Sequence, residues 1–341
     1  MFQKRGFDSD KYVREQTRAV LTRIKKFKRL YLEFGGKLVY DNHASRVLPG
    51  YKKTNKIKIL QELGKLKIIY CVNSRDLQSG RIVGKSKYTY EKQVIKDLRD
   101  LKKYGFTNLV IVITRFTKEK KTKTFAEKLS KAGKEIYFHK DFKGYTDSPR
   151  NAIKSFEIQP YIPIKEDLII MTGPAGNSGK MATALCQIYK EEKMKISSGF
   201  AKFEMFPIWN LPINHPVNLA YEAATADLQD EVLVDTYYKK FYKKTAVNYN
   251  RDINNFGILQ KICQLITKQK FPFGYKSPTD MGINMAKSGI INDEVCQRAA
   301  IREIYRRQKF YRKQYKRGKE NIKTVKRMDE IINKLKEVKN Q

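Results

Sequence analysis

Residues 168–181 read LIIMTGPAGNSGKM, and this segment indicates more about the fold than any other part of the sequence. Its apolar first half predicts a buried strand over Asp167–Met171. Three glycines follow within seven residues, and the pattern from Lys180 to Tyr189 is typical of a helix. A buried strand, a glycine-rich turn and a helix in immediate succession indicate an α/β protein.

The same succession is typical of a loop that binds a phosphate group. Glycines let backbone N–H groups turn toward an anion without a Cβ clash, and the start of a helix adds a partial positive charge. A lysine at that start would neutralise the anion. We therefore predict that a nucleotide or another phosphorylated ligand binds Thr172, Gly173, Gly176, Asn177, Ser178, Gly179 and Lys180. A structural glycine turn with an exposed lysine is the alternative.

The loop departs from the standard P-loop at two positions. Pro174 stands where the pattern has a glycine five residues before the Gly-Lys pair, and Met181 stands where it has a serine or threonine. The missing hydroxyl normally binds Mg²⁺, so Thr183 or a carboxylate from elsewhere would have to hold a metal ion. The loop thus predicts a nucleotide such as ATP as cofactor and leaves the use of magnesium open.

The rest of the chain alternates between short apolar runs and helical patterns. An opening helix is predicted from Ser9 to about Phe27, with Asp8 or Ser9 as its cap. Alternation of this kind predicts a mostly parallel sheet covered by helices. The predicted strands are Leu30–Phe34, Lys67–Val72, Leu109–Thr114 and Glu135–Phe138, and the later helices are Glu91–Lys103 and Thr122–Ala132.

A chain of 341 residues is about twice the commonest domain size, which predicts more than one domain. The segment from Gly144 to Pro163 has weak periodicity and several turn-forming residues, so we place a boundary there. The predicted parts are an N-terminal α/β domain over 1–155, a second α/β and helical domain over 156–290 that contains the glycine loop, and a basic helical tail over 291–341. Gly318 divides this tail into two predicted helices.

The formal net charge of +36 predicts attraction to polyanions such as nucleic acid. Residues 298–339 alone contain 16 basic and 5 acidic residues. An AT-rich coding sequence would also produce a lysine excess spread over a solvated surface, and composition does not separate the two explanations.

Neither a membrane span nor a secretory signal is visible in the sequence, so we expect a cytoplasmic protein. No run approaches the roughly 18 to 20 apolar residues that a span needs. The four cysteines lie far apart without a Cys-x-x-Cys pair, which argues against a zinc site and against a disulfide framework. They are expected to be reduced and mostly buried.

The segment from Phe203 to Tyr238 contains no lysine or arginine, which predicts that it is buried or shaped for a site. It contains Glu222 and Asp227, which would be costly to bury without a partner. Metal binding or recognition of a ligand hydroxyl would explain them, and helix capping or surface exposure are the alternatives. Lys202 and Glu204 alternate along a predicted strand and face the same side, either at the rim of a site or as a surface pair.

Further polar residues are candidates for ligand contacts. His43 and Arg46 follow a Gly-Gly pair and could hold a carboxylate or phosphate opposite the glycine loop, although a structural histidine is equally compatible. Asp280 lies in a Ser-Pro-Thr-Asp turn that is typical of a helix cap. A polar cluster suited to hydrogen bonding with a sugar, base or amide contains Asn248, Asn250, Arg251 and Asp252.

Seven segments of this sequence closely resemble the bacterial domain-of-unknown-function family 1846, also called uncharacterised protein family 0371. They are YLEFGGKL at 31–38, HASRVLPG at 43–50, SGKMAT at 178–183, AKFEMFPIWNLP at 201–212, HPVNLAYEAATADL at 215–228, VNYNRD at 247–252 and KSPTDMG at 276–282. The resemblance extends over roughly residues 5 to 305. The resemblance implies that members of the family are longer than this chain and have a further C-terminal domain. This chain is expected to lack that domain. If that domain completes an active site, this chain would bind without catalysing.

The prediction that unites these residues is an enzyme of the phosphoryl-transfer or ATP-dependent ligase type. The residues predicted to act in catalysis are Lys180, Asp227, Arg251 and Asp280. Those predicted to contact the substrate are His43, Arg46, Lys202, Glu204, Glu222, Asn248 and Asn250. The alternatives are a nucleic-acid-binding protein that uses the basic tail, and a non-catalytic protein that assembles, with itself or with a relative, through the tail helices.

Overall fold

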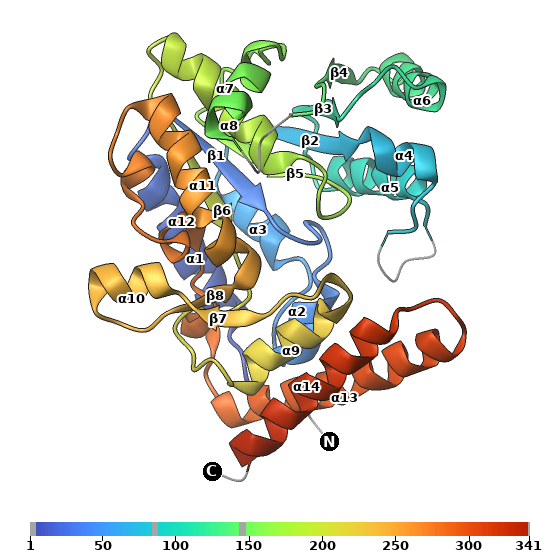
Figure 1. Cartoon of the computed structure of the whole chain (residues 1–341), viewed down its shortest axis with the longest axis vertical. Coiled ribbons are helices and arrows are strands. Elements are labelled where there is room, and N and C mark those ends of the chain that lie inside the picture. Colours follow the sequence, from blue (N-terminus) through green and yellow to red (C-terminus); the bar gives the residue numbers. More distant parts are fainter. Residues whose placement is uncertain (1–4, 84–87, 143–147, 340–341) are drawn as a thin grey trace.

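The computed structural model describes residues 5–83, 88–142 and 148–339, and a seven-stranded sheet lies at its centre (Figure 1). The strand order is β4-β3-β2-β5-β1-β6-β9, and all neighbouring strands pair in parallel. The strands are β1 (Arg29–Phe34), β2 (Lys67–Asn73), β3 (Leu109–Thr114), β4 (Glu135–Phe138), β5 (Leu168–Thr172), β6 (Ser198–Phe203) and β9 (Gly282–Ile283). A separate antiparallel pair contains β7 (Val232–Val234) and β8 (Val247–Tyr249).

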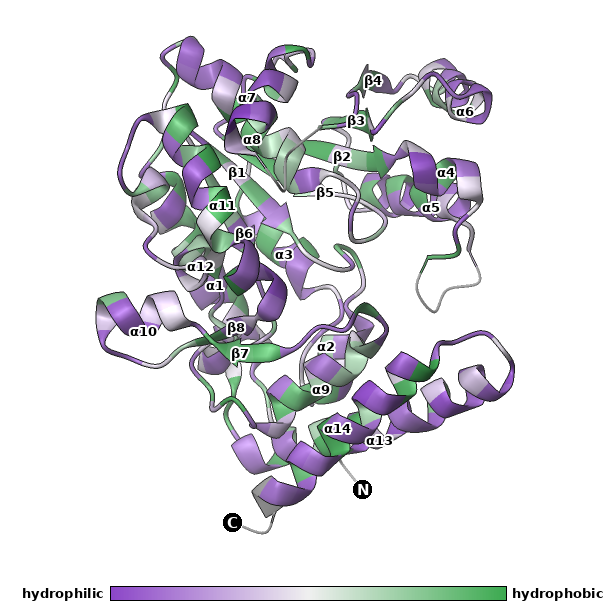
Figure 2. Cartoon of the chain, in the orientation of Figure 1, coloured by the Kyte–Doolittle hydropathy of each residue, from purple (hydrophilic) through white to green (hydrophobic). Residues whose placement is uncertain are grey.

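Helices cover both faces of the sheet, because side chains alternate between the two faces along each apolar strand. On β1, for example, Leu30 and Leu32 join one hydrophobic cluster and Tyr31 joins the other. The first face, named here the α1 face, is covered by α1 (Ser9–Ile24), α3 (Asn55–Glu62), α5 (Tyr90–Lys103) and α6 (Lys120–Lys131). The second, named the α8 face, is covered by α7 (Pro149–Glu157), α8 (Lys180–Lys193) and α11 (Asn250–Thr267). Figure 2 shows apolar central strands and polar outer surfaces on these helices.

A further helical group packs beyond the end of the sheet. Its long member α13 contacts α2, α9 and α14, and α13 and α14 lie side by side as an antiparallel hairpin (Figure 1). The remaining helices are α2 (Asn42–Val47), α4 (Ser74–Ser79), α9 (Pro216–Ala224), α10 (Thr236–Tyr242), α12 (Pro278–Met281), α13 (Asp293–Lys316) and α14 (Ile322–Lys339). Short 3-10 turns occur at Ala226–Leu228, Pro272–Gly274 and Ala286–Gly289.

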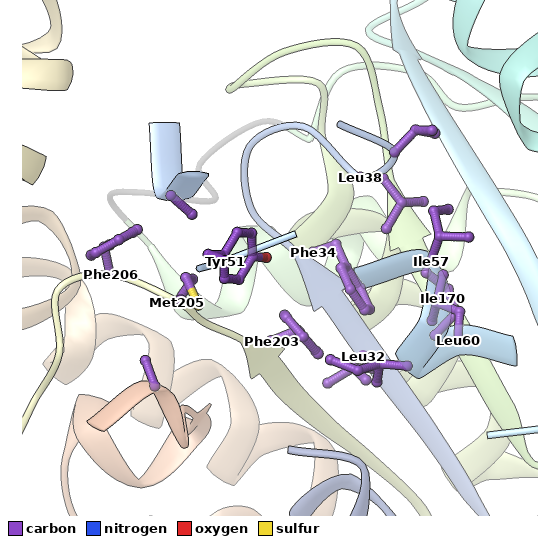
Figure 3. Packing of buried hydrophobic residues seen from close by; sticks show 14 of the residues in the cluster. Leu32, Phe34, Leu38, Tyr51, Ile57, Leu60, Ile170, Phe203, Met205 and Phe206 are labelled. Carbon is purple, nitrogen blue, oxygen red and sulfur yellow. The ribbon is translucent and has the colours of Figure 1, made fainter. Parts of the chain in front are cut away.

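Stacked rings join the carboxyl ends of β1 and β6. The rings of Phe34 and Phe203 are stacked with centroids 4.2 Å apart and planes inclined by 15° (Figure 3). The chain then continues to Phe206, which stacks on Tyr221 of α9 with centroids 6.0 Å apart. These contacts hold the segment after β6 against the helical group, so the strand ends beside it are fixed in place.

The structure confirms the predicted α/β fold with a mostly parallel sheet. The predicted strands at Leu109–Thr114 and Glu135–Phe138 have the observed bounds, and the others differ by one residue at one or both ends. The opening helix is capped by Asp8, whose side chain accepts from the N–H groups of Asp10 and Lys11. It ends at Ile24 rather than near Phe27, because the chain must turn there into β1.

Both α/β segments predicted as domains contribute to the one sheet. Strand β5 follows the predicted boundary, and it pairs with β1 on one side and with β2 on the other. Residues 144–147 of the predicted boundary lie outside the described residues, and Pro149–Glu157 forms α7.

The two helices predicted at the end of the chain are α13 and α14, and Gly318 lies between them with φ of +65°. All four cysteines are buried and none is paired. Within the described ranges, none of the helices combines the length and apolar character needed to cross a bilayer.

Candidate functional site

The connections that leave β1 and β5 run to opposite faces of the sheet. Strand β1 leads through α3 on the α1 face to β2, whereas β5 leads through α8 on the α8 face to β6. The two strands are neighbours, with Leu30 opposite Leu168. A crevice forms at the carboxyl edge where neighbouring parallel strands send their connections apart, and ligands of open α/β sheets bind in such crevices.

The glycine loop that follows β5 is held against the ends of β2 and β3. The Asn73 side-chain amide donates to the carbonyl of Asn177 at 3.3 Å, and the Thr114 hydroxyl donates to the carbonyl of Ser178 at 2.9 Å. Gly179 has φ of +88°, and a Cβ atom there would lie 2.9 Å from the Thr114 side chain. The loop therefore needs glycine at this position to approach β3 so closely.

Consecutive backbone N–H groups of the loop have no acceptor. Among the described residues, no N–H from Ala175 to Lys180 makes a hydrogen bond of normal geometry to a protein group, although Gly176 and Asn177 form a turn. The first N–H groups of any helix are free in this way, but here the free run extends back into the loop. The hydroxyl of Ser178 is also buried and makes no hydrogen bond within the described part of the chain. The arrangement is a row of donors beside the start of α8, which is suited to an anion.

Lys180 is directed toward the end of β1. Its Nζ atom lies 3.5 Å from Oε1 of Glu33, and the two side chains are 10% and 16% exposed. Since 3.5 Å is longer than a good charge-assisted hydrogen bond, the ion pair is loose. One oxygen of Glu33, Oε2, is buried without a hydrogen-bond partner among the described residues.

A second lysine and two more carboxyl groups lie on the α8 side of β6. Nζ of Lys202 is 2.6 Å from Oδ2 of Asp252, which stands in the first turn of α11. Burial acts to lower the pKa of Lys202, but the carboxylates of Asp252, Glu33 and Glu204 raise it above its usual value. Burial, with the charges of Asp252 and Glu33, raises the pKa of Glu204 to about 8 despite the opposing charge of Lys202.

We refer to Glu33, Lys180, Lys202, Glu204 and Asp252 as the lysine–carboxylate cluster. Its two ammonium and three carboxyl groups are balanced in charge only when one carboxyl is protonated, and Glu204 is the group whose pKa favours this. Oε1 of Glu204 is buried without a partner in the described structure. A carboxyl group that titrates near neutral pH can donate or accept a proton in catalysis.

A cavity of about 180 Å³ lies on the other side of the glycine loop. Its walls come from the segment after β1, from α5, and from the last residue of β5 with the residue that follows it. They include Leu38, Val39, Tyr40 and Asn42 from the first, Gln93, Asp97, Asp100 and Leu101 from the second, and Thr172 and Gly173 from the third. The loop thus borders the cavity at its beginning and the cluster at Lys180.

Two of the predicted substrate residues lie beside an internal carboxylate. Nε of Arg46 lies 3.0 Å from Glu303 of α13, and Nδ1 of His43 lies 3.7 Å from the same residue. Arg306 and Arg307 also pair with Glu303, and these hydrogen bonds strongly lower its pKa against the effect of burial. Arg46 therefore binds a carboxylate of the chain itself, and His43 lies beside that carboxylate without a hydrogen bond from either ring nitrogen among the described residues.

Glu222 and Asp227 connect α9 and its following turn to the α13–α14 hairpin. Glu222 is buried, accepts from the N–H of Val232 at 2.8 Å and pairs with Arg327 at 2.9 Å. Asp227 is exposed and accepts from the hydroxyl of Tyr311 at 2.9 Å. The structure therefore places both carboxylates in contacts between helices, apart from the cluster.

The other predicted residues lie around the start of α11 and in α12. Arg251 pairs with Asp230 at 2.7 Å, and Asn250 donates to the carbonyl of Gln229. Asn248 is buried and accepts from the N–H of Tyr249. Asp280 completes a capping box with Ser277, as its turn predicted. None of these side chains joins the cluster, although Arg251 and Asn250 adjoin Asp252 in the same helical turn.

Three residues of the site are not among those predicted to act in it. Glu33 and Asp97 are absent from the predicted set, and Asp252 is predicted only as part of a polar cluster. A signal for Glu33 does exist, because it is a charged residue in an apolar strand directly before Phe34 and two glycines. Asp97 has no such signal, since a helix of alternating charge gives no reason to single it out. As for metals, no group of three or more His, Cys, Asp or Glu side chains in the described ranges could hold an ion.

Comparison with known proteins gives the family of the chain. The protein-family model described as "Domain of unknown function DUF1846, N-terminal" matches residues 5–336. A UPF0371 protein of Clostridium tetani (strain Massachusetts / E88) is 42% identical over 97% of this chain and 66% of its own length. UPF0371 proteins of Clostridium botulinum (strain ATCC 19397 / Type A) and Clostridioides difficile (strain 630) are 40% and 41% identical over the same shares. The chain thus spans about two thirds of the length of these relatives, and it belongs to the DUF1846 family.

Proposed function

We propose that this chain binds a nucleotide or a related phosphorylated ligand on the glycine loop and supports phosphoryl transfer or ATP-dependent ligation beside it. The observation that carries the proposal is the row of free N–H groups from Ala175 to Lys180, at the crevice between β1 and β5. Free donors, a helix start and a lysine together form an anion site of the kind found in phosphate-binding loops.

The ion pair between Lys180 and Glu33 suits this role. An incoming phosphate competes with a single carboxylate at 3.5 Å, and its several oxygens can accept from both the ammonium group and the loop amides. Binding would release the Glu33 carboxylate toward Lys202. Glu33 already raises the pKa of that lysine. The ligand thus exchanges one partner of Lys180 for another without leaving a buried charge unpaired.

Glu204 is the group best suited to proton transfer. Its pKa of about 8 lies close to neutral pH, so both protonation states are accessible. Asp252 holds Lys202 at 2.6 Å, and of these two charges the Asp252 carboxylate acts more strongly on Glu204, so the pKa of Glu204 stays raised. In a ligase or transferase these residues would exchange a proton with the attacking or leaving group while the loop positions the phosphate.

The test is the thermal unfolding midpoint, Tm, of the chain with sodium tripolyphosphate and with nucleoside triphosphates, each with and without Mg²⁺. We expect a rise of a few degrees in the wild-type chain at saturating ligand, because binding to the native state alone stabilises it. Lys180→Ala should abolish the rise. Lys193→Ala, at the exposed far end of the same helix, should retain it. The absence of any rise in the wild-type chain would refute the proposal.

Nucleic-acid binding is the second candidate, and one feature of α13 favours it. Arg302, Arg306, Lys309, Lys313 and Lys316 are exposed and recur at spacings of four and three residues, so they form one helical face about 21 Å long. Tyr305, which is three residues from Arg302 and four from Lys309, adjoins this face and is 37% exposed. Basic side chains with exposed aromatic rings beside them are suited to single-stranded nucleic acid.

A further inference from the structure

We infer that the cavity beside the glycine loop receives the sugar and base of a nucleotide, with Asp97 accepting hydrogen bonds from the ribose hydroxyls. This inference rests on the proposed function, because it assigns the part of the ligand that the loop does not hold. It narrows the ligand from any phosphorylated compound to a nucleotide.

The position of the cavity is the first argument. Thr172 and Gly173 line it, and the free N–H groups of the loop begin two residues later at Ala175. A phosphate on these amides therefore lies next to the mouth of the cavity. The opposite wall is the segment after β1, which leaves the sheet on the α1 face, so the cavity occupies the crevice between the two diverging connections.

Asp97 provides the second argument. Its Oδ2 accepts from the hydroxyl of Tyr70 at 2.7 Å and its Oδ1 accepts from the side-chain amide of Gln93 at 2.6 Å. Each carboxylate oxygen can accept more than one hydrogen bond, so both retain capacity on the side that lines the cavity. The two neighbours also fix the orientation of the carboxylate. Pairs of adjacent hydroxyl groups, as in ribose, are the donors that such a fixed carboxylate recognises in nucleotide-binding α/β proteins.

The remaining walls suit a flat ring. Leu38, Val39 and Leu101 are apolar and buried, and Tyr40 is held in place by a contact of 3.2 Å between its hydroxyl and that of Tyr104. The ammonium group of Lys96 lies 5.4 Å from the centre of the Tyr40 ring. A volume of about 180 Å³ is below the roughly 300–1,000 Å³ of pockets for drug-sized ligands, so the cavity would enclose part of the nucleoside and leave the rest at its mouth.

The electrostatics of Asp97 agree with this use. Burial raises the pKa of Asp97 against the hydrogen bonds from Tyr70 and Gln93 and the charges of Lys37 and Lys96. A carboxyl group that has lost part of its hydration gains from new hydroxyl donors, because they replace hydrogen bonds to water.

The experiment compares dissociation constants, measured by calorimetry on the whole chain, for tripolyphosphate, the four common ribonucleoside triphosphates and the 2′,3′-dideoxy form of the one that binds most tightly. We expect at least one ribonucleoside triphosphate to bind tenfold or more tightly than tripolyphosphate, and its dideoxy form to lose most of that gain. Asp97→Asn should weaken the binding of the ribonucleotide and leave the dissociation constant of tripolyphosphate unchanged. Asp167→Asn, the same change at an exposed site at the other end of β5, should alter neither.

Each possible outcome decides something. Equal affinity for tripolyphosphate and for all nucleotides would overturn the cavity assignment and leave the phosphate site standing. A nucleotide preference that survives both the dideoxy form and Asp97→Asn would overturn the role of Asp97. If no compound binds, the proposed function fails and the inference fails with it. The dideoxy comparison uses only the wild-type chain, so it holds even if Asp97→Asn does not fold.

Discussion

Nothing in the sequence indicates an unusual pKa for Glu204, but in the folded chain its pKa is much higher than usual. The side chain is 8% exposed, it lies near Asp252 and Glu33, and its pKa rises from 4.5 to about 8. Between these two values the folded state keeps a proton that the unfolded state has released. The stabilising effect of this proton is therefore complete below pH 4.5 and is lost as the pH rises to 8.

Replacing Glu204 by glutamine removes this pH dependence. We expect Glu204 to add to the wild-type chain a falling slope of up to about 1.4 kcal/mol for each pH unit between pH 5 and pH 8, which His43 and His139, whose pKa values burial lowers, oppose below pH 6.5. Glu204→Gln should flatten that slope, because an amide does not titrate. Urea unfolding at several pH values measures the effect.

The matched control is Glu192→Gln, which changes an exposed carboxyl group on α8 and should leave the slope as it is. Identical slopes for the wild-type chain and Glu204→Gln would show that Glu204 is ionised in the folded state, which contradicts a raised pKa.

At the scale of elements, the unit formed by β5, the glycine loop and α8 contains two left-handed residues, Asn177 with φ of +61° and Gly179. Gly179 has φ of +88°, and the Thr114 side chain would lie 2.9 Å from any Cβ atom placed there. Gly176 lies in the same loop, but a Cβ atom at that position would meet no atom within 4 Å. The two glycines therefore have different roles although they look equivalent in the sequence.

Substitution by alanine separates the two roles. Gly179→Ala should lower the free energy of unfolding by about 1–3 kcal/mol through backbone strain and the clash with Thr114. Gly176→Ala should change it by less than about 0.5 kcal/mol. Urea unfolding of both variants provides the measurement, and an equal loss in the two would show that loop flexibility, not the contact with β3, determines the effect.

At the scale of the whole molecule, the basic residues behind the net charge of +36 differ in their surroundings. The α13–α14 hairpin presents an exposed basic face, while Arg327 of the same hairpin is buried against Glu222 of α9 and Arg307 is buried against Glu303 of its own helix. Some of the basic residues therefore attach the hairpin to the body, and only the exposed ones are available to a partner.

The exposed basic face of α13 predicts that the chain binds nucleic acid and that the affinity falls as the salt concentration rises. If the second candidate function holds, a short fluorescent single-stranded RNA should bind with an affinity that falls linearly in a plot of log K against log salt. Replacing both Lys309 and Lys313 by alanine should reduce the magnitude of the slope by about 1.4. Replacing Lys102 and Lys103 of α5 by alanine tests whether exposed lysines elsewhere act in the same way. Undetectable binding in fluorescence anisotropy, or a slope that neither pair changes, would exclude this face as the contact surface.

The local elements of this protein follow from its residue order. Apolar runs such as Leu109–Thr114 and the capped helix at Ser9 reflect side-chain periodicity and capping, which act within a few residues of the chain. The strand, glycine loop and helix around Lys180 are predictable for the same reason, because glycine chemistry is local. Residue type and spacing are therefore sufficient to name Lys180, Lys202 and Glu204 as candidates.

Which of these elements are neighbours depends instead on how the whole chain packs. The fold inserts β5 between β1 and β2, and this brings Lys180 to Glu33 across 147 residues of sequence. It likewise brings Lys202 to Asp252, and it places His43 and Arg46 against Glu303 instead of a ligand. Strand order in a parallel sheet is set by long-range packing of apolar faces, which local periodicity does not encode. For the same reason, the pKa of Glu204 is a property of the fold and not of its neighbours in the chain.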